Sequence, residues 1–494
     1  MHERARGSGS RTLGAWTPPP PRRSVGSVPR LSHVGVLLCA GACSVSLGGA
    51  PDVDDWPPPL PEPEVIPAEP QRSGDPQVGW DTLVHDGYVG CGVPANVYWL
   101  GAGPTPPTLL LPDRRGTNAR LPFDRTAFIT SAGVEVVTAN CLFCHAGFLE
   151  NDLVVGLGAS EKDFSGTLEP AVELPGMMLA EGAERREWER WASRMRTIQP
   201  RIRTEVTGAN PADNLAATLF AHRDPATLAW SNAPLREEPT KQVAPVDVPP
   251  WWLMKRKNAM FHNGAGRGDQ VRMMMLASNL CVDDVKTARA IDERFTHIRA
   301  FILSVEPPRY PGHVDEGLVE QGRGVFQANC ARCHGMPGEP HPNLLIPTEI
   351  VGTDPMAAGA GMFARRFVDW FAASFYGERA RLEPRRGYVA PPLDGIWASA
   401  PYLHNGSVPT LAALLQSSRR PTRWSHLPQR RYDHDALGWA HVEVAADLLE
   451  EPTGQARRHV YDATRPGYAN TGHTFGDALH DDERRALLEF LKTL

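Results

Sequence analysis

Two short peptides hold the residues whose types and spacing could do chemistry. Each has two cysteines three positions apart and a histidine directly after the second cysteine: Cys141, Cys144 and His145 in the first peptide, and Cys330, Cys333 and His334 in the second. This pattern is typical of covalent c-type haem attachment. The two thiols add to the two vinyl groups of one porphyrin, and the adjacent histidine offers an imidazole nitrogen to the iron.

Two other interpretations of these peptides are a zinc half-site and a dithiol redox pair. Zinc requires a second Cys or His pair nearby, and neither peptide has one at ordinary spacing. A thioredoxin-like dithiol lies in a βαβ context, which the surrounding sequence does not predict. Because the same five-residue pattern occurs twice, the sequence predicts a dihaem c-type cytochrome with two covalently bound haem c groups.

The composition is that of a globular protein with large loops. The chain has 494 residues, of which 41% are hydrophobic and 22% charged, enough for two to four domains with a sizeable core. A formal net charge of −6, with no basic run interleaved with aromatic residues, argues against a nucleic-acid partner. The high content of proline (47) and glycine (45) predicts short helices joined by long irregular loops.

The N-terminal region is typical of an export leader. Val34–Ala42 is an apolar run preceded by arginines and too short to span a bilayer, so it predicts a signal-peptide core within residues 1–50. Cys43 follows small residues, which leaves two alternatives open: a lipid anchor at Cys43, or cleavage without lipidation. Since c-type haem is attached outside the cytoplasm, we expect an exported protein, either periplasmic or anchored as a lipoprotein.

The fold class expected is mostly α, with two cytochrome c-like haem domains. We assign residues 51–77 to a Pro-rich linker, 78–306 to an N-terminal haem domain and 309–494 to a C-terminal one, with Pro307-Pro308 as the break. An amphipathic helix is predicted over Asp283–Val305. Further predicted helices cover Glu181–Arg196, Gln270–Cys281, Glu316–Ala328 and Asp481–Leu494.

Two features of the C-terminal region predict how its helices pack. Gly322 and Phe326 are four residues apart, and therefore on one face of the helix that leads into the second haem peptide. The final helix carries an apolar stripe of Leu487, Leu488 and Leu491. We expect it to cross the first helix at the Gly322 notch, the arrangement that closes a cytochrome c domain around its haem.

Besides the four cysteines of the haem peptides and Cys39 and Cys43 of the N-terminal apolar segment, two cysteines remain, Cys91 and Cys281. Spare cysteines of an exported protein tend to pair, so we expect a disulfide between them. The alternative is two separate buried thiols.

A resemblance to a known superfamily rests on several longer motifs. Gly387–Leu411, which reads GYVAPPLDGIWASAPYLHNGSVPTL, resembles the C-terminal haem domain of the bacterial dihaem cytochrome c peroxidase superfamily. The segments Pro249–Trp252, Lys257–Gly264 and Asn470–Gly476 are similar to its rubber-oxygenase-like branch of dihaem c-type cytochromes. The likeness runs from about Tyr88 to Leu494.

This resemblance implies different roles for the two haems. The haem of His145 is expected to be reactive, with an open or weakly held face for peroxide or dioxygen. The haem of His334 is expected to be six-coordinate and to pass electrons, with His473 as its second ligand. Other candidates for that ligand are His404, which in the superfamily usually borders the haem, and Met356 and Met362. His473 has the alternative of a surface loop histidine.

The resemblance also suggests residues for the distal side of the first haem. Phe261 corresponds to an aromatic residue that lies over the iron, although Met260 stands where the family often has a small residue. His262 has three possible roles: a distal acid/base group, a sixth ligand, or a solvent-facing loop residue. Trp251 and Trp252 are expected in the pocket, in the path between the haems, or simply in the core. No acid/base glutamate is assigned by motif.

Three functions remain open from the sequence. The expected one is a peroxidase-like or haem oxygenase-like oxidoreductase that acts on peroxide, dioxygen or an oxidisable organic substrate, with a small redox protein as electron partner. The first alternative is a non-catalytic electron-transfer dihaem cytochrome. The second is a lipid-anchored scaffold protein with structural haems. A catalytic haem needs an open coordination position on its iron, whereas an electron-transfer haem does not. The sequence does not show whether such a position exists.

Overall fold

The computed structural model describes residues 56–426, 431–445 and 457–494. About 40% of the structure is helical and 13% is in strands, so the prediction of a mostly α fold is confirmed only in part. Contacts group residues 55–494 into one compact unit. The predicted leader, including Cys43, lies outside the described residues. Among the described residues, no helix combines the length and the apolar character needed to cross a membrane.

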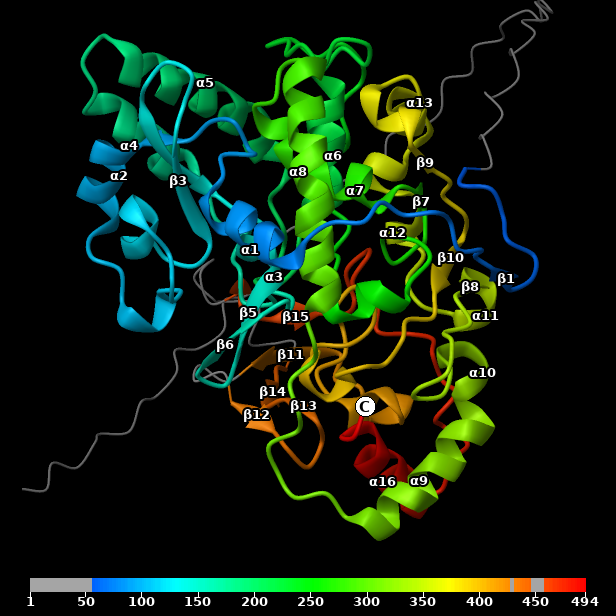
Figure 1. The fold of residues 1–494 in the computed structure, drawn as a ribbon. Helices are drawn as coiled ribbons and strands as arrows, with labels where there is room; N and C mark the ends of the chain where they lie inside the picture. Colours follow the sequence, from blue (N-terminus) through cyan, green and yellow to red (C-terminus); the bar gives the residue numbers. More distant parts are fainter. Residues whose placement is uncertain (1–55, 427–430, 446–456) are drawn as a thin grey trace, which may run out of the picture. The chain divides into compact units, whose positions relative to one another are not determined.

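The helices and strands are short and are spread along the whole described chain (Figure 1). The α-helices are α1 (Pro76–His85), α2 (Ala95–Ala102), α3 (Leu142–His145), α4 (Glu169–Met177), α5 (Ala183–Ile198), α6 (Ala212–Ala221), α7 (Gln270–Met274), α8 (Val285–Ser304), α9 (Glu316–Asn329), α10 (Ala331–His334), α11 (Thr348–Val351), α12 (Met356–Gly359), α13 (Arg365–Ala372), α14 (Leu411–Leu414) and α16 (Asp481–Leu491). The strands are β1 (Glu64–Val65), β2 (Val93–Pro94), β3 (Arg125–Ile129), β4 (Glu135–Ala139), β5 (Ala146–Leu149), β6 (Asp152–Val155), β7 (Gly266–Gly268), β8 (Leu344–Pro347), β9 (Ala380–Leu382), β10 (Gly387–Val389), β11 (Arg423–His426), β12 (Tyr432–Asp433), β13 (Gly438–Trp439), β14 (His441–Glu443) and β15 (Tyr461–Asp462).

Helix α8 is the longest described helix, and it lies in the largest hydrophobic core beside α1 (Figure 1). It begins where the carboxylate of Asp284 accepts a hydrogen bond from the backbone N–H of Thr287 (2.7 Å). Besides the buried carboxylate of Asp292, its buried face carries apolar residues at helical spacing, as the sequence predicts: Ala288, Ile291, Phe295, Ile298 and Ile302. The helix predicted over Gln270–Cys281 instead splits into α7 and a 3₁₀ segment, Met275–Leu280.

Short antiparallel sheets position the first haem peptide. Strands β3 and β4 form a hairpin with β2 at its edge, and β4 ends directly before the peptide. The peptide is followed at once by a second hairpin, β5–β6. β-Branched residues in β4 face the core and favour extended backbone, which the helix-based prediction did not include.

The N-terminal end of the described chain packs against distant segments. Strand β1 pairs with β8, which in turn pairs with β10 (Figure 1). Ile66 is completely buried, and the indole of Trp56 donates to the carbonyl of Phe363 (2.8 Å). The part of the Pro-rich segment that the structure describes is therefore held along the folded body.

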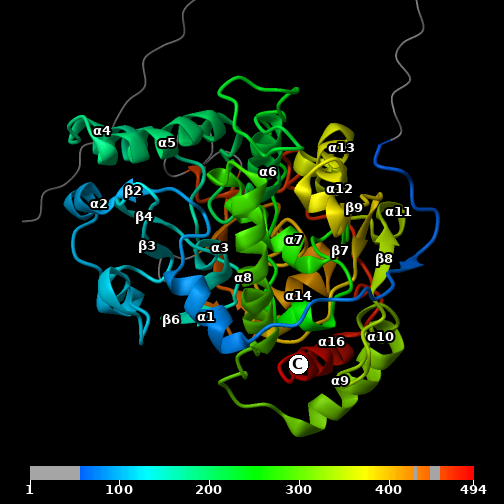
Figure 2. The ribbon, with the colours of Figure 1, turned by 45° about the horizontal axis from the view of Figure 1, so that its top comes forward.

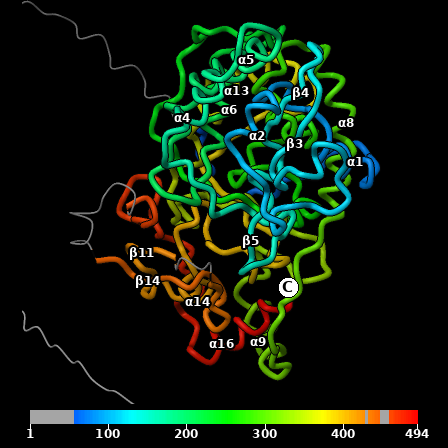
Figure 3. The backbone as a smooth tube through the Cα atoms, turned by 90° about the vertical axis from the view of Figure 1, so that its left-hand side faces the viewer, coloured from blue at the N-terminus to red at the C-terminus, as the bar shows by residue number. Residues whose placement is uncertain are grey.

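Helices α9 and α16 cross as predicted, and they lie side by side in Figures 2 and 3. A Cβ atom added at Gly322 would lie 2.0 Å from the carbonyl oxygen of Ala486, so only glycine allows this approach. The rings of Phe326 and Phe490 meet beside the notch, with their centroids 5.1 Å apart. The crossing brings the chain end next to the helix that leads into Cys330.

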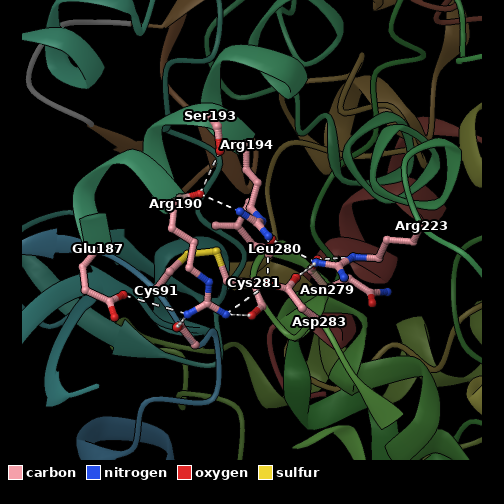
Figure 4. The surroundings of a disulfide bond; sticks show 11 residues. Cys91, Glu187, Arg190, Ser193, Arg194, Arg223, Asn279, Leu280, Cys281 and Asp283 are labelled. Carbon is pink, nitrogen blue, oxygen red and sulfur yellow. Dashed lines mark hydrogen bonds and ion pairs between the residues drawn. A yellow bond between two sulfur atoms is a disulfide. The ribbon is translucent and has the colours of Figure 1, made fainter. Parts of the chain in front are cut away.

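The predicted disulfide between Cys91 and Cys281 is confirmed (Figure 4). The guanidinium of Arg190 donates to the carbonyls of Gly90 (3.0 Å) and Cys281 (2.6 Å), one on each side of the bridge. The carboxylate of Asp283 accepts from Arg190 and from two further arginines, Arg194 and Arg223. The bridge and this ion-pair cluster fix the chain just before α8.

The glycine notch gives a stability prediction. Gly322→Ala should lower the free energy of unfolding by about 1–3 kcal/mol, because the new methyl group forces α9 away from α16. Gly324→Ala is the matched control on the same helix, since a Cβ at Gly324 meets nothing within 4 Å. Urea denaturation measures the free energy of unfolding of both variants. Equal stability of the two variants would contradict close packing at the notch.

Candidate haem sites

The first haem peptide begins as a single helical turn after β4. Asn140 starts it, because its side-chain oxygen accepts from the backbone N–H of Leu142 (2.9 Å) and its amide donates to the carbonyl of Phe123 (3.0 Å). The backbone N–H of His145 then donates to the carbonyl of Cys141 (3.1 Å). This turn places both cysteines and the histidine of the motif close together.

The two thiols of the first peptide lie against polar side chains that the sequence analysis did not identify. The hydroxyl of Tyr88 lies 3.3 Å from Sγ of Cys141, and the amide of Asn210 lies 3.4 Å from Sγ of Cys144. Burial raises the pKa of the Cys141 thiol to about 11. A redox-active dithiol needs a lowered thiol pKa, so this environment does not favour the dithiol interpretation.

His145 lies in a buried aromatic environment. Its ring stacks on that of Trp251, with centroids 5.0 Å apart and planes at 23°. Two backbone hydrogen bonds hold Trp251 there. The backbone N–H of Trp251 donates to the carbonyl of Gly156 (2.8 Å), and the backbone N–H of Gly156 donates to the carbonyl of His145 (2.8 Å). Burial lowers the pKa of His145 to about 4, which keeps the imidazole neutral, the form that binds iron.

The second haem peptide follows α9 without a break. Its histidine, His334, ends the short helix α10, and Gly335 leaves the helix with a φ of 72°. The Nδ1 atom of His334 lies 2.8 Å from the carbonyl oxygen of Pro391. A carbonyl can only accept, so Nδ1 carries the proton and Nε2 is left as the metal-binding nitrogen.

His473 faces His334 across the second site. The centroids of the two imidazoles are 6.2 Å apart. A bond between a metal ion and an imidazole nitrogen is about 2 Å, so two imidazoles on opposite sides of one ion have centroids roughly 6 Å apart. Burial lowers the pKa of His473 to about 4, with His334 and Arg420 adding to the effect, and its Nδ1 is buried without a hydrogen-bond partner. These residues fit a haem iron with two axial histidines.

The loop that presents His473 is fixed from outside by Arg420. The guanidinium donates to the carbonyls of Asn470 (2.7 Å), Gly472 (2.6 Å) and His473 (3.0 Å). His473 itself has a φ of 44°, a costly conformation for a residue other than glycine, which persists only when its surroundings impose it. The surface-loop alternative for His473 therefore does not describe its position. No sequence motif pointed to Arg420.

Phe261, the distal candidate for the first site, packs against the same hydrophobic core as Trp251 and Cys141, and His262 follows it in the chain. Phe261 has a φ of 68°, and its ring meets that of Phe363 edge-on at 5.3 Å between centroids. His262 is half-buried, with Nε2 at 2.8 Å from the carbonyl of Asp247, and burial lowers its pKa to about 4. His262 is therefore an uncharged internal group, and not a solvent-facing one.

His404, the second candidate for the axial ligand, lies elsewhere. Its ring stacks on Tyr388 (4.0 Å between centroids) and lies 6.4 Å from the ring of His262. In the part of the chain that the structure describes, its ring contacts do not include His334 or His473. The geometry thus groups His404 with the distal candidates of the first site. Met362 is buried in the largest hydrophobic core, and Met356 packs against a separate cluster that contains Tyr388.

The indole of Trp252 forms a hydrogen bond to the segment that supports His334. It is fully buried and donates to the carbonyl of Asp394 (2.8 Å). Asp394 stands three residues after Pro391, whose carbonyl accepts from His334. Trp251, on the other side, stacks on His145. Trp251 is therefore in contact with the first site, and Trp252 reaches the segment whose Pro391 carbonyl accepts from His334.

Comparison with known families identifies one region of the chain. Residues 387–425 match the RoxA-like, cytochrome c-like family model. This region contains β10, Pro391, Asp394, His404 and Arg420, and it includes the stretch on which the sequence resemblance rests. A RoxA-like cytochrome c domain implies covalently bound haem c. The wider dihaem peroxidase superfamily remains a prediction.

Two relatives come from Sinorhizobium fredii. The uncharacterized protein y4iJ is 30% identical to this chain, with 38% of the chain and 41% of y4iJ covered. The uncharacterized protein y4iM is 31% identical, with 39% of the chain and 52% of y4iM covered. The chain thus spans about half the length of these relatives or less.

The facing imidazoles give a spectroscopic prediction. His473→Ala should change the spin state of the second haem from low spin, because its iron loses one of two histidine ligands. Mass spectrometry should still find the same covalent haem content. Added imidazole should restore the low-spin spectrum. His404→Ala, which removes another buried histidine, is the control and should leave the spin state of the second haem unchanged. A low-spin spectrum that survives His473→Ala would refute the ligand assignment.

Proposed function

We propose that this protein is an exported dihaem c-type cytochrome that activates peroxide or dioxygen at the His145 site and relays electrons through the His334 site. The observation that carries the proposal is the asymmetry between the two sites. His334 faces a second imidazole at 6.2 Å between centroids. Within the described residues, the ring contact of His145 is instead with Trp251. An iron with two histidine ligands transfers electrons, whereas an iron with one ligand can bind a small molecule.

The chain's own residues give the first site its reactive character. A haem bound there supplies the redox chemistry, while the protein orients it and excludes water. Phe261 and Phe363 form an apolar wall, and Trp251 holds His145 in place through stacking. His262 and His404 are uncharged because of burial, which lowers their pKa values to about 4 and about 3.

The tryptophan pair supports electron transfer between the sites. Starting at His145, the connection runs through the stacked ring of Trp251 to the next residue, Trp252. It continues through the hydrogen bond from Trp252 to Asp394 and the backbone up to Pro391, whose carbonyl accepts from His334. We infer that electrons delivered to the His334 site by a small redox protein use this route.

The disulfide supports the proposed export. Disulfides form and persist in oxidising compartments outside the cytoplasm, where c-type haem is also attached. The bridge between Cys91 and Cys281 fits such a location. A lipid anchor at Cys43 is an alternative to a free periplasmic protein.

Spectroscopy of the purified holoprotein tests the proposed function. We expect mass spectrometry to find two haems and electron paramagnetic resonance to show one low-spin and one high-spin haem. Titration with hydrogen peroxide and with dioxygen should change the high-spin signal alone. A Cys141→Ala, Cys144→Ala double variant, which lacks the first haem, should lose this response. Two low-spin haems that respond to neither peroxide, dioxygen nor cyanide in any redox state would favour the non-catalytic electron carrier.

The tryptophan connection gives a kinetic prediction. Trp252→Phe removes the indole N–H that reaches the Asp394 carbonyl, and it should slow electron equilibration between the haems several-fold without changing the haem content. Stopped-flow spectroscopy measures this rate. Trp188→Phe is the matched control, because Trp188 is a buried tryptophan whose indole donates to the Val172 carbonyl (3.0 Å) within the α4–α5 region. Equal rates in both variants would exclude the Trp252 route.

A further inference from the structure

One ring nitrogen of His341 is buried without a partner beside the second haem peptide. His341 lies in the loop that joins α10 to β8 (Figure 2). Burial lowers its pKa to about 4, so the ring is neutral. Its Nδ1 accepts a hydrogen bond from the backbone N–H of Asn343 (3.1 Å), which leaves the ring proton on Nε2. Within the described residues, Nε2 is buried and has no acceptor. Such a donor is costly, which indicates that a bound group accepts from it.

The loop of His341 packs against the haem peptide itself. At Gly335, the residue after His334, an added Cβ would lie 3.0 Å from Cδ of Pro342 and 3.6 Å from Cα of His341. The guanidinium of Arg256 also reaches this loop, since it donates to the carbonyl of Glu339 (2.7 Å). The loop is therefore fixed against the peptide that presents His334.

Asn343 joins this loop to the segment around Lys257. Its side-chain amide donates to the carbonyl of Arg256 (3.1 Å), and its side-chain oxygen accepts from the backbone N–H of Asn258 (2.8 Å). Lys257 is the residue between these two contacts. The backbone on either side of Lys257 is thus bound by the residue that also donates to His341.

Lys257 is a half-buried lysine without a counter-charge. Among the described residues, no carboxylate pairs with its ammonium group and no acceptor forms a hydrogen bond to it. The carboxylates of neighbouring elements are engaged elsewhere: Asp394 pairs with Arg256 (2.9 Å), and Glu306 pairs with Lys255 (2.6 Å). Burial lowers the pKa of Lys257 to about 8, because the charged form loses water and gains no partner.

We propose that His341 and Lys257 bind the propionates of the haem held by His334, with Nε2 of His341 as hydrogen-bond donor and the Lys257 ammonium as counter-charge. A haem c group carries two propionate carboxylates, which are negative and only accept hydrogen bonds. A buried carboxylate requires a paired charge and hydrogen-bond donors. The two unpartnered groups supply one of each. The inference rests on the second haem of the proposed function and does not depend on chemistry at the first.

The test measures the midpoint potential of each haem by redox titration of the holoprotein, followed by electron paramagnetic resonance. The signal that His473→Ala changes identifies the second haem. Ferric haem carries one positive charge more than ferrous haem, so a propionate without a counter-charge favours the ferric form. Lys257→Gln should therefore make reduction of the second haem about tenfold less favourable, a fall of about 59 mV. Lys257→Arg, which keeps the charge, should stay close to wild type.

Lys255→Gln is the matched control. It removes the same charge two residues earlier, from a lysine that pairs with Glu306, and should leave both potentials unchanged. His341→Phe should lower the second potential by less than Lys257→Gln does, and His341→Gln, which keeps an N–H donor, should restore part of it. Resonance Raman spectra should show changed propionate bending vibrations in Lys257→Gln and His341→Phe, which a purely structural role would not produce.

The outcomes separate this inference from the proposed function. Covalent haem content and the low-spin signal should stay as in the wild type, which distinguishes a lost propionate contact from misfolding. An unchanged second potential in Lys257→Gln and His341→Phe, or a fall confined to the first haem, would overturn the inference alone. A purified protein without a second haem would overturn both.

Discussion

The pairing of two neutral imidazoles, those of His334 and His473, is the interaction on which the rest of the C-terminal region depends. Each ring is fixed from its outer side. The Pro391 carbonyl accepts from Nδ1 of His334, while Arg420 holds the backbone of the His473 loop through carbonyl oxygens. Neither support comes from the haem peptide itself. The region therefore folds so that two histidines 139 positions apart face each other, with their ring centroids at 6.2 Å.

The first site is organised by different physical means. Aromatic contacts dominate there, with Trp251 stacked on His145 and Phe363 against Phe261. Burial lowers the pKa values of His262 and His404, which keeps these two distal candidates uncharged. In a weakly polar interior of this kind, a charge that develops interacts more strongly with neighbouring charges and dipoles than it would in water. A facing pair of imidazoles at one site and an apolar wall with isolated histidines at the other would suit the electron transfer and the substrate activation that we propose.

Several predictions from the sequence are confirmed because they depend on local patterns. The amphipathic face of α8 follows from helical spacing, and the crossing of α9 and α16 follows from the Gly322 notch and the apolar stripe of the last helix. The strands were missed, because β1, β8 and β10 are two to four residues long and form only when distant segments meet. Tyr88, Asn210 and Arg420 were missed for a related reason. Each acts through a contact with a residue far away in the chain, which no local spacing reveals.

The sequence by itself determined the chemistry that is covalent or local: the two cysteine–histidine peptides, the helices with apolar stripes and the pair of cysteines that bridge. The tertiary structure alone decided which histidine lies opposite which. It separated His404 from His473 and grouped His404 with His262. The physical reason is that attachment depends on neighbours along the chain, whereas a metal's second ligand and a buried group's pKa depend on neighbours in space.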